Sequence, residues 1–206
     1  MTVKTNYQKE LSALLESLPE GKTPKLLLHS CCGPCSSYVL EYLSKFFDIS
    51  LLYYNPNIQL REEFQKRLDC QKELLQKMEL KRPAKLIECH WRGEEFDRAV
   101  QGLEAEPEGG ARCTVCFNLR LEETAKLAKE MGFDYFCTTL TLSPHKDAGR
   151  INRLGQVLAE KYGVKWLPSD FKKRDGYKRS IELSAKYGLY RQNWCGCRYS
   201  RRPEDG

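Results

Sequence analysis

Short apolar segments alternate with longer amphipathic segments along almost the whole of this 206-residue chain. Five apolar segments have the length of buried strands and are bounded by turn-forming residues: residues 25–30, 49–57, 84–89, 133–140 and 164–168. Other segments show the apolar spacing of helices: residues 7–18, 36–46, 62–78, 93–103, 113–131, 151–163 and 176–187. This alternation predicts an α/β fold with a mostly parallel sheet flanked by helices, whose ligands bind beyond the carboxyl ends of the strands.

The length of the chain favours one compact domain over residues 1–206. We expect an N-terminal helix within residues 1–24 and a basic C-terminal segment at residues 171–206. The first residues lack the continuous apolar region of a signal peptide, and no window approaches 18 uncharged apolar residues. We therefore expect a cytoplasmic protein without a membrane span.

The formal charge of +6 is concentrated in the C-terminal segment. Residues 171–206 hold ten Lys and Arg against four Asp and Glu, and the rest of the chain holds 24 of each sign. Clustered cations attract polyanions through counterion release, although a solvated basic face has the same composition. The charge pattern therefore favours, without requiring, a nucleic-acid partner.

Seven of the ten cysteines fall into three tight clusters. In a reducing cytosol such clusters indicate metal binding or thiol chemistry rather than a disulfide framework. The first cluster, Cys31, Cys32 and Cys35, directly follows a predicted strand, and the intervening Gly33 and Pro34 favour a sharp bend. Adjacent Cys31 and Cys32 point in different directions on a turn, so they can bind different corners of one metal centre.

The second cluster is Cys113 and Cys116, a CxxC pair in the first turn of a predicted helix, where helix N–H groups favour thiolates. With Cys31 and Cys32 the pair supplies four thiolates, the usual number for a 4Fe-4S cluster or a structural zinc. Soft ligands alone do not decide between these metals.

The third cluster, Cys195 and Cys197, is a CxC pair in a basic and aromatic setting. Such a pair can form a strained, easily reduced disulfide and carry two electrons, with Arg191 and Arg198 favouring thiolates. Two further ligands of a larger zinc site are the alternative.

The remaining polar and cysteine residues carry weaker signals. Cys70, Cys89, Cys137 and His29 are expected to be structural, since they lie alone in predicted strands or a helix. His145 stands in a loop where a substrate could bind. Aromatic and amide side chains after the second strand could stack on and hydrogen-bond a planar base, or could simply pack beside an Asn-Pro turn.

Six segments together resemble the cobalamin-independent epoxyqueuosine reductases of the QueH type: HSCCGPCSS, YYNPNI, RCxxCFNLRL, FxxFCTTLTLSPHKD, KYGVKW and YRQNWCGC. They extend from Leu26 to Tyr199. The resemblance implies a fold like that of the adenine nucleotide alpha hydrolases, a HUP-like Rossmannoid domain. It also implies the last step of queuosine synthesis, in which the epoxide of epoxyqueuosine is reduced at the wobble position of tRNAs with GUN anticodons (Tyr, His, Asn and Asp).

The resemblance also assigns roles to individual residues. The ligands of a 4Fe-4S cluster fall on Cys31, Cys32, Cys113 and Cys116, and the redox-active pair falls on Cys195 and Cys197. The resemblance further implies an additional metal, here an iron ion, beside the cluster. Some relatives have Asp where this chain has Cys35, so the role of Cys35 stays open. An external electron donor is required. We predict these substrate-binding residues: Tyr54, Asn55, Asn57, His145, Lys146 and Arg191.

Three other functions are compatible with parts of the pattern. A zinc-stabilised nucleic-acid-binding module without catalysis needs only four thiolates and a basic tail. An ATP-dependent tRNA-modifying enzyme is disfavoured, because CCGPCSS keeps one Gly and lacks the Asp of SGGxDS. A general thiol–disulfide oxidoreductase would not need seven clustered cysteines.

Overall fold

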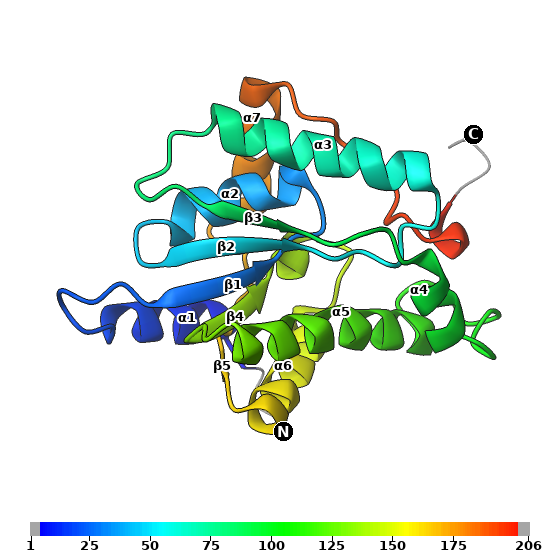
Figure 1. Cartoon of the computed structure of the whole chain (residues 1–206), viewed down its shortest axis with the longest axis horizontal. Coiled ribbons are helices and arrows are strands. Elements are labelled where there is room, and N and C mark those ends of the chain that lie inside the picture. The colour runs from blue at the N-terminus through cyan, green and yellow to red at the C-terminus, as the bar shows by residue number, and fades with distance from the viewer. Residues whose placement is uncertain (1–4, 202–206) are drawn as a thin grey trace.

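The centre of the computed structural model, which describes residues 5–201, is a sheet of five parallel strands in the order β3-β2-β1-β4-β5 (Figure 1). The strands are β1 Lys25–His29, β2 Asp48–Tyr53, β3 Lys85–Glu88, β4 Tyr135–Thr138 and β5 Lys165–Trp166. Each overlaps one of the five predicted apolar segments, and β2 begins one residue before its segment. The prediction of an α/β fold with a parallel sheet is therefore confirmed. The predicted fourth strand is too long, because residues 139–142 turn into a 3₁₀ helix.

Seven α-helices are found in the described residues: α1 Tyr7–Glu16, α2 Gly33–Leu43, α3 Arg61–Lys77, α4 Gly93–Ala99, α5 Ala111–Glu130, α6 Ala148–Tyr162 and α7 Gly176–Tyr187. In Figure 1, α2, α3 and α7 lie above the sheet, and α5 and α6 lie below it. The sheet is therefore covered on both faces, as the apolar character of its strands requires.

Successive side chains of the central strand enter two different cores. Leu26 and Leu28 of β1 belong to the core that contains residues of α1, α2 and α3. Leu27 belongs to the core formed with α5 and α6. All three leucines are fully buried, which fixes the register of β1 because a shift of one residue would exchange the two faces.

The connections leave β1 and β4 on opposite faces of the sheet, since α2 covers one face and α5 and α6 cover the other. An α/β sheet opens into a crevice at the carboxyl ends of its strands at such a switch point. The Cys31–Cys35 loop follows β1 and the 3₁₀ helix follows β4, so both border this crevice.

The segment after α7, red in Figure 1, returns along the carboxyl end of the sheet to α3 and α4. Arg198 forms an ion pair with Asp97 of α4 at 2.9 Å, and Arg67 of α3 donates hydrogen bonds to the carbonyls of Trp194 and Cys195. Residues 1–4 and 202–206 of the predicted terminal segments lie outside the described residues. Within residues 5–201, no helix has the length and apolar character needed to cross a membrane.

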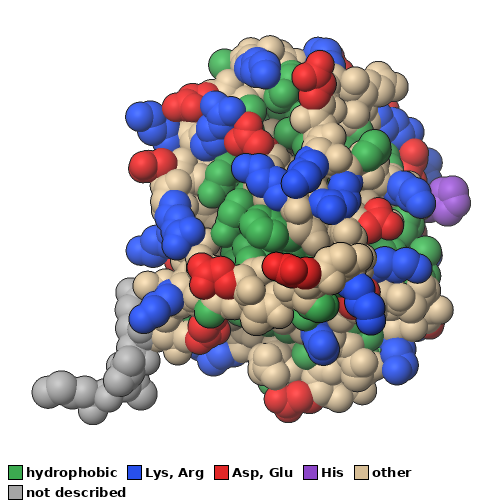
Figure 2. Space-filling model, turned by 90° about the vertical axis from the view of Figure 1, so that its left-hand side faces the viewer, with side chains coloured by type: hydrophobic (Ala, Val, Ile, Leu, Met, Phe, Trp, Pro, Cys, Tyr) green, Lys and Arg blue, Asp and Glu red, His purple; other side chains and the backbone are tan. Residues whose placement is uncertain are grey.

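The opposite side of the molecule, where the strands begin, is shown in Figure 2. Lys and Arg side chains are interspersed there with Asp and Glu around a central group of apolar side chains. This face therefore offers no continuous basic surface.

Candidate functional site

All seven clustered cysteines line two cavities at the carboxyl end of the sheet. The main cavity, about 470 Å³ in volume, is lined by Cys31, Cys32, Cys35 and Cys195. The side cavity, about 110 Å³, is lined by Cys113, Cys116, Cys195 and Cys197. Both are also lined by Arg120, His145 and Lys146. These shared walls make the two cavities neighbours, so three clusters that are far apart in sequence meet in one region.

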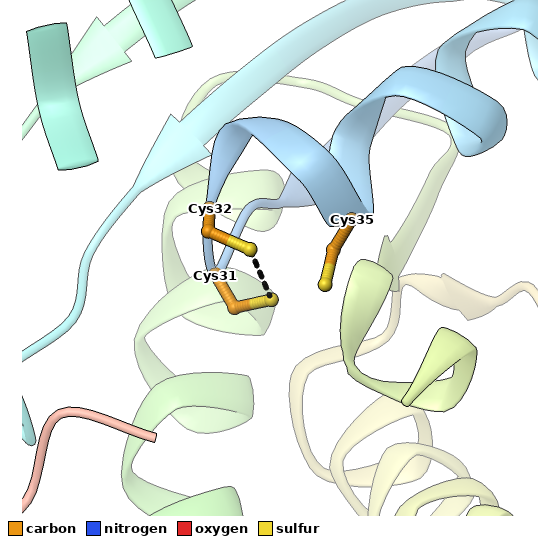
Figure 3. A group of neighbouring side chains, drawn as sticks. All are labelled: Cys31, Cys32 and Cys35. Carbon is orange, nitrogen blue, oxygen red and sulfur yellow. Dashed lines mark hydrogen bonds between the residues drawn. The ribbon is translucent and has the colours of Figure 1, made fainter. Parts of the chain in front are cut away.

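The sulfur atoms of Cys31, Cys32 and Cys35 face one another (Figure 3) and all lie within 4.8 Å of each other. The Sγ atoms of Cys31 and Cys32 are 3.8 Å apart. Hydrogen bonds from the other two thiols hold the pKa of Cys31 well below its ordinary value, while the same contact raises the pKa of Cys32 to about 12. These contacts favour the thiolate on Cys31 over those on its neighbours, and the trio can offer three soft ligands to a metal.

The backbone around the trio explains this convergence. Cys32 is the N-cap of α2 with extended backbone angles, and Pro34 occupies the first turn of the helix, where it removes no hydrogen bond. The positive end of the helix therefore faces the thiols, which favours thiolate charge. A Cβ atom on Gly33 would lie only 2.9 Å from Sγ of Cys70, so glycine lets the loop approach α3.

Thr139, in the 3₁₀ helix after β4, hydrogen-bonds Cys31 twice. Its hydroxyl accepts from the Cys31 N–H at 3.1 Å and donates to Cys31 Sγ at 3.3 Å. The hydroxyl of the preceding Thr138 forms a hydrogen bond with Nδ1 of the His29 ring at 2.8 Å. Burial, with a smaller contribution from the Arg120 charge, lowers the pKa of His29 to about 3. His29 is therefore a neutral core residue, as predicted, that links β1 to the turn holding Thr139.

The CxxC pair lies in the first turns of α5, as predicted. The N–H of Gly109 donates to Cys113 Sγ at 3.1 Å. Cys116 is buried, and this burial raises its pKa to about 11 against the opposing charge of Arg120. The group of sulfurs within 4.8 Å of one another comprises the Cys31 trio and neither Cys113 nor Cys116. The four predicted cluster ligands thus border neighbouring cavities without forming one tight group.

The CxC pair places the Sγ atoms of Cys195 and Cys197 3.5 Å apart as free thiols. The Ser200 hydroxyl lies 2.9 Å from Cys195 Sγ. The Cys197 thiol lowers the pKa of Cys195 well below its ordinary value, and the same contact raises the pKa of Cys197. A thiolate beside a thiol is the reactive form of a dithiol, and in this pair the shifts favour the thiolate on Cys195.

Side chains from early in the chain hold the CxC loop in place. Asn57 donates to the Cys195 carbonyl at 2.9 Å, and Arg67 donates to the same oxygen at 3.2 Å. Gln59 hydrogen-bonds the loop on both sides of Cys197. Its backbone N–H donates to the Gly196 carbonyl, and its side-chain oxygen accepts from the backbone N–H of Arg198. The loop that carries the pair is therefore held mainly through its backbone atoms.

Five of the six predicted substrate-binding residues line the main cavity: Asn55, Asn57, His145, Lys146 and Arg191. Tyr54 lines neither cavity. Its ring packs in the core under α5, and its hydroxyl donates to Glu95 at 2.6 Å. Cys70 and Cys137, predicted to be structural, are buried, whereas Cys89 is half-buried.

Sequence reasoning missed three residues that shape the site: Arg67, Arg120 and Thr139. The sequence does mark both arginines as unusual, because each occupies a helix position where the apolar spacing predicts an apolar residue. Arg67 lies between Phe64 and Leu68 on the buried side of α3, and Arg120 lies beside Leu121 on the buried side of α5. A charge on a buried stripe indicates that the fold brings a polar or charged partner to it.

Comparison with known proteins places the chain among relatives of one kind. Residues 26–203 match the family model described as epoxyqueuosine reductase QueH. A QueH epoxyqueuosine reductase of Staphylococcus epidermidis is 46% identical over 199 residues, covering 94% of this chain and 84% of the relative. That of Streptococcus pyogenes serotype M1 is 42% identical over 202 residues (97% and 79%), and that of Thermotoga maritima is 35% identical over 181 residues (85% and 89%).

Proposed function

The chain belongs to the QueH family of epoxyqueuosine reductases, and on this ground we propose that it reduces epoxyqueuosine to queuosine at the wobble position of tRNA. The observation that carries the proposal is the family match over residues 26–203, which includes all seven cysteines of the two cavities. The chain is then an oxidoreductase in tRNA processing. A zinc-stabilised binding module without catalysis is not favoured, because the matched relatives are named as reductases.

The reaction removes one oxygen atom from the substrate. Epoxide, two electrons and two protons give an alkene and water, so the site must deliver both electrons and protons. The Cys195 and Cys197 dithiol can supply two electrons by becoming a disulfide, which an external donor must then reduce. Lys146 lines both cavities, and an ammonium group there can donate a hydrogen bond to the oxygen as it acquires charge.

The thiols fit a 4Fe-4S cluster by their chemistry. Cys31, Cys32, Cys113 and Cys116 would hold it, since soft thiolates select iron or zinc. The sulfurs of iron–sulfur centres accept hydrogen bonds, and the Gly109 N–H and a threonine hydroxyl already donate to two of these four sulfurs. When bound, a cluster supplies one-electron transfer. Cys35 would hold an additional iron beside it, because its sulfur belongs to the tight trio.

The substrate is a tRNA, for which we propose a GUN anticodon. A phosphate backbone needs exposed cations, and the C-terminal segment offers Lys173, Arg174 and Lys178 as exposed residues. Lys172 and Arg179 are less suited, because each is paired within the protein, at 2.7 Å to Asp170 and Glu41. Replacing the three exposed cations by Ala should weaken tRNA binding and reduce the slope of log K against log salt by about 2 to 3. Unchanged binding would exclude this surface.

The decisive experiment is anaerobic reconstitution with iron and sulfide, followed by reaction with epoxyqueuosine-containing tRNA and a reductant, with queuosine read by mass. We expect conversion by the wild type and none by Cys31→Ser or Cys195→Ser. Cys137→Ser is the matched control, since Cys137 is buried in β4 and lines neither main nor side cavity. Full iron content without conversion would refute the function, and a colourless zinc-bound protein would support the non-catalytic alternative.

A further inference from the structure

Three arginines in the described chain are almost fully buried: Arg67, Arg112 and Arg120, with 2–3% of each exposed. A buried guanidinium is stable only with acceptors or an opposite charge around it. Arg67 has both, since it pairs with Glu63 at 2.6 Å and donates to two carbonyls. Arg112 donates to three carbonyl oxygens in residues 103–106. Each of these two guanidinium groups is therefore held by several protein acceptors, although Nε of Arg112 has no partner.

Arg120 is the exception. Its Nε donates to the Cys116 carbonyl at 3.2 Å, and its guanidinium lies 5.8 Å from the centre of the Phe117 ring. It forms no ion pair with any carboxylate of residues 5–201. Its side chain lines both the main and the side cavity. A fixed positive charge thus stands between the two groups of cysteines without a protein anion to balance it.

The thiolates around the cavities are the negative charges that could balance Arg120. Four thiolates around a 4Fe-4S core of charge +2 leave a net charge of −2, and one further electron makes it −3. Lys146 also borders both cavities, but its side chain is only half-buried and can turn to solvent. Arg120 belongs to α5 and only 3% of it is exposed, so water screens its charge less than that of a surface residue.

We propose that Arg120 is the fixed counter-charge of the metal–thiolate centre formed at these two cavities, and that it makes the centre easier to reduce. The proposal rests on the proposed function. In this proposal Arg120 binds neither substrate nor metal. Its positive charge stabilises the electron that an external one-electron donor adds to the centre.

The test compares four reconstituted proteins: wild type, Arg120→Met, Arg120→Lys and Arg82→Met. Arg82 is the matched control, because its guanidinium bonds the Ser44 and Lys45 carbonyls before β2, at the other end of the sheet. Iron and sulfide per chain are measured first. Each protein is then titrated with dithionite at controlled potentials while the electron paramagnetic resonance signal of the reduced cluster is followed.

At the potential where half of the wild-type cluster is reduced, Arg120→Met should show a ratio of reduced to oxidised cluster about tenfold lower, which is a midpoint about 59 mV more negative. Arg120→Lys keeps the charge and should stay near wild type, as should Arg82→Met. If Arg120→Met takes up no cluster while Arg120→Lys does, the need for charge is supported.

Three results would overturn the inference. Arg120→Met could hold a full cluster at the wild-type midpoint, and a loss of tRNA binding alone would then mark Arg120 as a phosphate contact. Arg120→Lys could shift the midpoint as far as Arg120→Met, or take up no cluster although it keeps the charge. These results leave the proposed function intact when the wild type still produces queuosine. A wild type that binds no cluster under any condition would remove both proposals.

Discussion

Gly196 separates the two thiols of the CxC pair, and a methyl group added there should displace the loop that carries both thiols. Its φ is +102°, and a Cβ atom would lie 2.8 Å from Cγ1 of Ile58 and 3.3 Å from Nη1 of Arg67. In Gly196→Ala the positive φ costs about 1–2 kcal/mol. The overlap with Ile58 costs about 1–3 kcal/mol more. The docked loop is then disfavoured by about 2–5 kcal/mol, roughly 30-fold to several thousand-fold in its equilibrium constant.

The loop is joined to the rest of the protein by a few hydrogen bonds, so we expect it to undock locally rather than unfold the domain. Alkylation of Cys197, which is 6% exposed, should then become at least about tenfold faster, as read by mass spectrometry of the digested protein. Gly188→Ala is the control, because Gly188 also has a positive φ, +64°, but a methyl group added there would meet no heavy atom within 4 Å. Wild-type alkylation and wild-type urea unfolding in Gly196→Ala would refute the reasoning.

Three further predictions concern stability. Arg67→Met should cost about 3–5 kcal/mol in urea unfolding, because the largely buried Glu63 carboxylate loses its counter-charge and keeps only the Tyr190 hydroxyl as partner; an unchanged midpoint would contradict the pairing. Hydrogen bonds from Arg179 hold the pKa of Glu41 below its ordinary value of 4.5, so Glu41 contributes stability above that pH and loses it as the pH falls. The difference in unfolding free energy between wild type and Glu41→Gln should therefore shrink from pH 7 to pH 3, and a constant difference would argue against the pair. Gly155→Ala places a Cβ atom 2.3 Å from the Trp166 ring and should lower stability by about 1–3 kcal/mol, checked by thermal unfolding; an equal or higher Tm would show that α6 can shift away.

The positions of helices and strands could be predicted where local signals were strong. The predicted final helix, 176–187, coincides with α7 because glycines stand at both of its ends, and Gly188 takes the left-handed conformation that ends a helix. The start of α6 was placed three residues late, at Ile151. Asp147 caps the helix with its side chain on Arg150 N–H, so the helix begins at Ala148 in a segment without apolar periodicity.

The position of the Cys31–Cys35 loop at the site was predictable, since the loop follows a strand and ligands bind beyond the carboxyl ends of parallel strands. The meeting of all seven clustered cysteines and the grouping within the site were not predictable. Tyr54 follows the last residue of β2, and its ring packs under α5, while Glu95 of α4, 41 residues away, accepts a hydrogen bond from its hydroxyl. The separation of Cys113 from the Cys31 trio likewise depends on how α5 packs against the sheet. These arrangements depend on contacts between residues that are far apart in the chain, which a local stretch of sequence does not reveal.

The anchoring of the CxC loop has a consequence for the order in which the protein matures. Asn57 and Arg67 meet the Cys195 carbonyl across 138 and 128 residues of chain, whereas Cys31, Cys32 and Cys35 are neighbours in sequence. On the ribosome the trio therefore emerges, with β1 and β2, long before the segment that closes the main cavity over it. Contacts of such sequence separation form late, so the thiols of the trio stay open to solvent until the C-terminal segment docks and closes the main cavity.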